Sequence, residues 1–173
     1  LDVVIDAQPA TPSAPTAGVI TQPSCAVATG SFTITSYEST STYTFTPSAT
    51  VDAATGVVTL AAGATYTFTE TDASGCISAA SLDVVIDAQP ATPSAPTAGS
   101  ITQPTCGRPG RFAINSYDAN SIYTFTPSAT VDAATGVVTL AAGATYTFTE
   151  TNAAGCVSAA SANVVILSAP PCP

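Results

Sequence analysis

The sequence contains no lysine, histidine, methionine or tryptophan, and Arg108 and Arg111 are its only cationic side chains. Eleven acidic residues give it a formal charge of −9. Nucleic-acid binding requires a basic surface, and anionic membranes attract clusters of Lys and Arg, so we expect neither as a partner. No apolar run approaches the roughly 20 residues that cross a bilayer, which predicts no membrane insertion.

The same absences argue against catalysis. Serine and threonine are abundant, but no His or Lys is present to activate a hydroxyl nucleophile. Glu70 and Asp72 could suggest the paired carboxylates of a glycosidase, yet the equivalent residues further along the chain are Glu150 and Asn152. We therefore predict no catalytic residues and no enzymatic activity.

Metal ligands are equally scarce. Zinc sites use His or closely spaced Cys pairs, and neither occurs in this sequence. Calcium prefers clustered acidic oxygens, and no acid-dense loop is present. We predict no cofactor and no metal site, with structural calcium beside Asp83 and Asp87 as the alternative.

An internal repeat dominates what is present. Leu1–Gly18 is identical to Leu82–Gly99, and Tyr43–Thr71 recurs as Tyr123–Thr151. The chain therefore holds two copies of one unit, preceded by the tail of a third, and we expect it to be an internal piece of a longer tandem array. The predicted divisions are the closing strand of a preceding repeat at 1–7, a proline-rich linker at 8–17, repeat 1 at 18–87, a linker at 88–98, repeat 2 at 99–167 and the start of the next linker at 168–173.

Each copy is built from short strand-like segments separated by turns. Apolar and hydroxyl residues alternate in Thr42–Thr46 and Ala64–Thr71, which predicts strands with aromatic side chains on one face. Further strands are expected at Gly18–Thr21, Ser31–Ser36, Gly56–Leu60 and within Ile77–Asp87. Six or seven short strands in about 75 residues predict an all-β chain of tandem immunoglobulin-like β-sandwiches.

The linker between the copies carries Pro90, Pro93 and Pro96. Proline at every third position suits the polyproline II helix, which has three residues per turn. Such a segment acts as a semi-rigid spacer between domains. An ordinary inter-domain loop is the alternative.

The five cysteines are Cys25, Cys76, Cys106, Cys156 and Cys172. The first four occupy matching positions in the two copies, which favours the pairs Cys25–Cys76 and Cys106–Cys156. Small domains often need such covalent staples, and disulfides indicate an oxidising, extracellular compartment. Cys172 is left unpaired within the chain, with either a partner beyond these residues or a reactive thiol.

The repeat has three sequence motifs: Thr21-Gln-Pro-Ser-Cys25, Leu60-Ala-Ala-Gly63-Ala-Thr-Tyr66 and Asp72-Ala-Ser-Gly75-Cys76. Together they resemble the repeats of giant gliding-motility and adhesion proteins on the surface of Bacteroidota. The resemblance implies immunoglobulin-like beads, export by the type IX system and display on the surface of a Gram-negative bacterium. One departure is that Phe45 and Phe125 stand where the family often has Trp.

Two further features bear on function. Gly63 permits a corner before Tyr66, whose hydroxyl we expect to bond back to the corner backbone as in a tyrosine corner. The copies differ most between residues 26–42 and 107–122, a window that contains both arginines. Either this difference is drift, or Arg108 and Arg111 mark a contact surface.

The leading functional hypothesis is a structural stalk that holds an adhesive tip away from the cell. Its partners would be neighbouring repeats, and possible contacts with other copies include strand addition and lateral association. The first alternative is a subunit of a self-assembling filament or surface layer. The second is a module that binds glycan, ice or calcium, for which the hydroxyl row Thr65, Thr67, Thr69 and Thr71 is the candidate surface.

Overall fold

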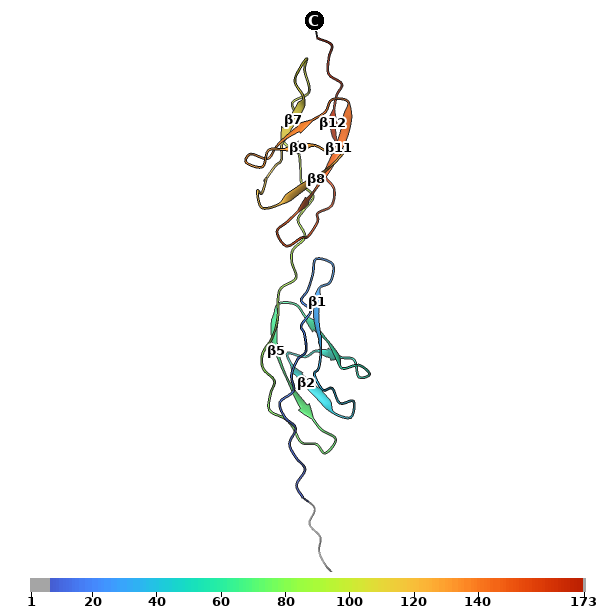
Figure 1. The fold of residues 1–173 in the computed structure, drawn as a ribbon, viewed down its shortest axis with the longest axis vertical. Coiled ribbons are helices and arrows are strands. Elements are labelled where there is room, and N and C mark those ends of the chain that lie inside the picture. Colours follow the sequence, from blue (N-terminus) through green and yellow to red (C-terminus); the bar gives the residue numbers. More distant parts are fainter. Residues whose placement is uncertain (1–6, 173) are drawn as a thin grey trace, which may run out of the picture. The chain divides into compact units, whose positions relative to one another are not determined.

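A computed structural model describes residues 7–172 and divides the chain into two units, Leu1–Pro90 and Ala91–Pro173. All regular structure in the described residues is β (Figure 1). No helix long and apolar enough to cross a membrane occurs within residues 7–172. The predicted closing strand at residues 1–7 falls almost entirely outside the described residues.

Unit 1 contains two antiparallel three-stranded sheets. The first has the order β1-β4-β3 and the second the order β2-β5-β6. The strands are β1 (Thr29–Thr33), β2 (Thr42–Thr46), β3 (Thr50–Val51), β4 (Val57–Ala61), β5 (Ala64–Thr71) and β6 (Val84–Ile86).

Unit 2 repeats this arrangement with the orders β7-β10-β9 and β12-β11-β8. Its strands are β7 (Gly110–Ala113), β8 (Ile122–Thr126), β9 (Thr130–Val131), β10 (Val137–Leu140), β11 (Ala144–Thr151) and β12 (Val164–Ile166). Figure 1 shows the paired strands β11 and β12 side by side in this unit.

A further edge segment completes the first sheet of each unit. In unit 1, Ala17 and Thr21 make isolated antiparallel bridges to Ile34 and Ser31, which places residues 17–21 beside β1. The sheets are then four-stranded and three-stranded, with the strand order of an immunoglobulin constant-type domain. The predicted fold class, tandem immunoglobulin-like sandwiches, is confirmed.

The core forms because strand alternation turns the aromatic side chains inward. In β5, Tyr66 and Phe68 are buried while the intervening Thr residues are not. Phe68 stacks on Phe45 with ring centroids 4.7 Å apart. Phe45 thus fills the place where the family resemblance suggested Trp, and it contributes aromatic contact area in the same way.

The strand predictions differ in accuracy. Thr42–Thr46 and Ala64–Thr71 are strands with the predicted bounds. Gly18–Thr21 makes only bridges, and the segment 77–87 is a strand only at Val84–Ile86. The two-residue strand at Thr50–Val51 was not predicted, because two residues carry no readable alternation.

Candidate functional site

The chain enters and leaves each sandwich at opposite ends. In unit 1, Thr29 pairs with Ala61 and Ala64 pairs with Ile86, so the loop of Cys25, the corner 61–64 and the end of β6 share one end. We call this the outgoing end, because the chain departs there after Ile86.

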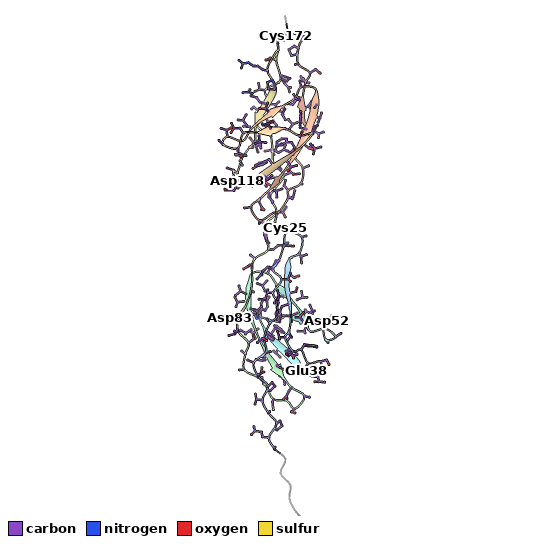
Figure 2. All side chains as sticks on the ribbon, in the orientation of Figure 1. Cys25, Glu38, Asp52, Asp83, Asp118 and Cys172 are labelled. Carbon is purple, nitrogen blue, oxygen red and sulfur yellow. A yellow bond between two sulfur atoms is a disulfide. The ribbon has the colours of Figure 1, made fainter. Side chains whose placement is uncertain are left out.

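The opposite end of unit 1 is the incoming end. Here Ala17 bridges Ile34, Ile34 N–H donates to the Gly56 carbonyl, and Thr71 bridges Ile77 directly after Cys76. Figure 2 shows Cys25 and Glu38 at the two opposite ends of unit 1, with Glu38 in the loop that precedes β2 at the incoming end.

A glutamine side chain fastens the outgoing end of unit 1. Gln22 Nε2 donates to the Val85 carbonyl at 3.0 Å, and Gln22 Oε1 accepts from the Asp87 N–H at 2.9 Å. The departing chain then lies against the cysteine loop, because Gln89 Nε2 donates to the carbonyls of Ser24 (3.2 Å) and Cys25 (3.3 Å).

Unit 2 has the same glutamine contact. Gln103 Nε2 donates to Val165 O at 3.1 Å, and Gln103 Oε1 accepts from Leu167 N at 2.9 Å. Residue patterns in the sequence did not indicate a role for these glutamines. The available signal was their repetition inside the Thr-Gln-Pro-x-Cys motif of both copies.

The cysteine pairing differs from the prediction. Cys106 bonds to Cys172, with Cα atoms 5.0 Å apart, and Cys76 is a free thiol. Cys25 and Cys156 are also in the disulfide-bonded state. The predicted pairs Cys25–Cys76 and Cys106–Cys156 are therefore wrong, and so is the prediction that Cys172 has no partner in the chain.

The physical reason lies in the topology of the unit. Cys25 is beside the start of β5 and Cys76 follows the end of β5. Eight residues of strand separate these ends by about 23 Å, whereas a disulfide requires Cα atoms about 4.4–6.8 Å apart. Two cysteines that recur at matching positions in both copies therefore do not have to pair with each other.

Cys76 is held in a tight loop at the incoming end. Asp72 Oδ1 accepts from the N–H groups of Ser74 (2.8 Å) and Cys76 (2.9 Å). Gly75 closes this loop at φ +80°, in the left-handed region that glycine adopts without strain. The Cys76 residue is half-buried in this position.

The equivalent loop of unit 2 contacts the arriving chain. Asn152 Oδ1 accepts from Cys156 N at 3.0 Å, as Asp72 does for Cys76. Asn152 Nδ2 also donates to the Ala91 carbonyl at 2.8 Å. The Asp72 side chain has no N–H with which to make this second bond, so the Asp/Asn difference between the copies falls on a contact to the linker.

The structure brings the two arginines together. Arg108 and Arg111 line one surface hollow of about 200 Å³, with Thr102, Gln103, Thr105 and Pro109. The hollow lies at the outgoing end of unit 2, between the loop that contains Cys106 and the start of β7, which carries Arg111. A contact function for this surface stays a prediction.

The carboxylates singled out earlier have structural roles. Glu70 Oε1 accepts from Ser41 Oγ at 2.8 Å, and Asp72 organises the Cys76 loop. Asp83 and Asp87 flank β6, and within residues 7–172 no group of three or more His, Cys, Asp or Glu residues is arranged for a metal. Calcium at Asp83 and Asp87 stays an untested prediction.

The tyrosine corner predicted at Tyr66 is confirmed. Tyr66 is 2% exposed and its hydroxyl donates to the Ala61 carbonyl at 3.2 Å. In unit 2 the Tyr146 hydroxyl accepts from Ala141 N at 3.0 Å and lies 3.3 Å from Ala141 O. The bond ties β5 or β11 to the corner that precedes it.

No protein-family model and no curated protein matches the sequence. The crystal structure of the C-terminal 282-residue fragment of intimin, in complex with the intimin-binding domain of the translocated intimin receptor, is similar with a TM-score of 0.48 and 15% identity. The match covers 87% of this chain and 64% of that chain, so this chain spans less than two thirds of the fragment.

A second solved structure is that of the chicken CNTN1 FN1–FN3 domains, with a TM-score of 0.28 and 12% identity. It covers 95% of this chain and 68% of that chain. Both similarities are low in sequence, so the immunoglobulin-like assignment depends on the strand order and the tyrosine corner described above.

Proposed function

We propose that the chain is a non-catalytic spacer segment in the stalk of a large secreted cell-surface adhesin. The observation that carries this proposal is the path of the polypeptide, which arrives at one end of each sandwich and departs from the other. Each repeat therefore separates the points at which its two neighbours are attached by the length of its strands. Neighbouring repeats are the partners that such a segment requires.

The disulfide of unit 2 supports a role under tension. Strands β7 to β12 all lie between Cys106 and Cys172, which are 66 residues apart in sequence. Force applied along the polypeptide is carried by this covalent bond and not by the hydrogen bonds between the enclosed strands. The sandwich is thus protected from mechanical unfolding as long as the bond is oxidised.

Disulfide bonding also supports a location outside the cell, because structural disulfides persist in oxidising compartments. Display on a Gram-negative surface and type IX export are part of the proposal through the family resemblance. The glutamine contacts make strand addition at β6 less favourable, since Gln22 already occupies the outward-facing Val85 carbonyl and Asp87 N–H.

Single-molecule stretching of the full chain between its termini tests the spacer function. The oxidised chain should stop short of its full contour length, and reduction should lengthen it by at least about 220 Å, the extended length of the residues enclosed by Cys106 and Cys172. A variant with all five cysteines replaced by Ser is the control and should show no change on reduction. Equal extension of the oxidised and reduced chains would contradict the proposal.

A further inference from the structure

We propose that Cys76 is a covalent docking point, whose thiol forms a disulfide with the cysteine at the Cys25 position of a preceding copy of the repeat. The inference deepens the spacer proposal by naming the covalent partner. It rests on the repeat and on cysteine chemistry, so it can fail while the spacer function holds.

The first observation is a difference between two equivalent cysteines. Cys76 is a free thiol, whereas Cys156, at the same position of the second copy, is disulfide-bonded. The loops that present them are alike: Asp72 and Asn152 each accept the cysteine N–H through Oδ1. The loop geometry at this position is therefore suited to a disulfide in both copies, although Asp72 lacks the Nδ2 group through which Asn152 also bonds the arriving chain.

The second observation excludes a partner within unit 1. Its other cysteine, Cys25, is disulfide-bonded and lies at the outgoing end, about 23 Å of strand away from the end of β5. The thiol that completes Cys76 must come from outside unit 1.

The third observation is the path of the chain at the two ends. In unit 1 the departing residue Gln89 bonds to the Cys25 carbonyl. In unit 2 the arriving residue Ala91 bonds to Asn152, in the loop that carries the disulfide-forming position. In a longer array, the linker that arrives at the loop of Cys76 comes from the outgoing end of the preceding copy. The cysteine at the Cys25 position of that copy lies at the same end.

The link has a direction, because unit 2 closes its own outgoing end. Cys172 lies six residues after Ile166, where the first copy has Thr92 six residues after Ile86. The Cys106–Cys172 bond removes the equivalent of Cys25 from reaction with a following copy. The open thiol is at the incoming end of unit 1 alone, so covalent extension proceeds only toward preceding repeats.

The bond forms by thiol–disulfide exchange with a small-molecule disulfide such as oxidised glutathione. The Cys76 thiolate attacks one sulfur, forms a mixed disulfide and releases one glutathione thiolate, which takes up a proton. The partner's thiolate then attacks the Cys76 sulfur and releases the second glutathione thiolate, which is also protonated. Two protein thiols are oxidised and one glutathione disulfide is reduced to two thiols.

The test uses the chain lengthened by one copy, with residues 1–81 placed before residues 1–173 and Cys76→Ser introduced in the added copy. After refolding with a glutathione redox buffer, thiols are counted under denaturing conditions and disulfide-linked peptides are identified by mass spectrometry. We expect no free thiol and a link between Cys76 and the added copy's Cys25. Two free thiols would overturn the proposal.

A matched control carries Cys25→Ser as well as Cys76→Ser in the added copy. It should retain one free thiol, on Cys76 of the original chain, which shows that the added Cys25 is the group consumed. Gel filtration without reductant separates the two sources of a partner thiol. A monomer with no free thiol supports a link within one polypeptide, and a disulfide-linked dimer would overturn it.

Discussion

The hydroxyl oxygen of Ser81 accepts a hydrogen bond from the backbone N–H of Phe68 at 3.0 Å. The Ser81 N–H in turn donates to the Phe68 carbonyl at 2.8 Å. Ser78 and Glu70 make the same pair of bonds, at 2.9 Å and 2.8 Å. Along the far half of β5, serine hydroxyls thus replace the backbone carbonyl acceptors of a neighbouring strand, while the serine backbone N–H groups still act as donors.

Replacing Ser81 with Ala should destabilise unit 1, because the buried Phe68 N–H loses its acceptor. We expect a loss of about 1–3 kcal/mol, the cost of leaving a buried donor unpaired. Chemical denaturation of the variant measures it. Ser161→Ala, which removes the equivalent bond at 3.1 Å in unit 2, should cost a similar amount, and Ala at the exposed Ser48 should change nothing.

These serines explain why one part of the fold could not be predicted. The alternation of Thr with Tyr and Phe in β2 and β5 revealed both strands with the right bounds. The segment 77–83 has no such alternation, and it is attached to β5 by side-chain hydroxyls instead of a full ladder. Sequence patterns report on strand periodicity and carry no signal for that kind of attachment.

The candidate site shows a second limit. The cysteines recur at matching positions in the two copies, and pairing them within each copy gave the wrong disulfides. The sequence shows that these positions repeat, but it does not show which end of a sandwich each cysteine occupies. The tyrosine corner was predictable, since glycine and tyrosine at fixed spacing specify a local geometry. Long-range contacts such as Gln22 with Val85, 63 residues apart, have no comparable local signature.

Substituting Gln22 and Gln103 with Ala should expose the outer edge of β6 and β12. The amides of these glutamines occupy backbone groups that would otherwise be open to another strand. Val85 and Val165 are 52% and 49% exposed on the same strands, which adds apolar surface to the freed edge. We expect concentration-dependent self-association in sedimentation velocity, while a variant with Ala at the exposed Thr44 should stay monomeric.

Removing the hydroxyl at the tyrosine corner should weaken each unit. Tyr66→Phe is expected to cost about 0.5–1.5 kcal/mol of unfolding free energy, the usual contribution of one hydrogen bond. Tyr146→Phe should cost at least as much, because it also leaves the Ala141 N–H without the hydroxyl that accepts from it at 3.0 Å. Equal stability of both variants and the parent chain would show that the corner bond is dispensable.

Alkaline pH should destabilise both units through Tyr43 and Tyr123. Burial is the largest effect and raises the pKa of each hydroxyl above 10.0. The N–H of Glu38 or Asp118, which bonds to the hydroxyl, lowers the pKa in part, and the Glu70 or Glu150 carboxylate raises it by a smaller amount. The unfolded chain therefore loses these protons first. Stability is unaffected below about pH 10 and falls as the pH rises through the folded pKa. The Tyr43→Phe/Tyr123→Phe variant should show a shallower decline in urea titrations between pH 9 and 11, values chosen around the ordinary tyrosine pKa of about 10.

Loss of the Cys106–Cys172 bond should destabilise unit 2 and leave unit 1 unchanged. The bond closes a 66-residue separation around every strand of unit 2, and a loop of that length restricts the unfolded chain by about 4 kcal/mol in the chain-entropy description. Differential scanning calorimetry of Cys106→Ser/Cys172→Ser should show one transition moved to lower temperature. Cys76→Ser removes a thiol that forms no disulfide in the chain, so its calorimetric trace should match that of the parent. If Cys76→Ser lowered a transition by as much as Cys106→Ser/Cys172→Ser does, Cys76 would be disulfide-bonded in the chain, and the inference that it is open to a preceding repeat would be contradicted.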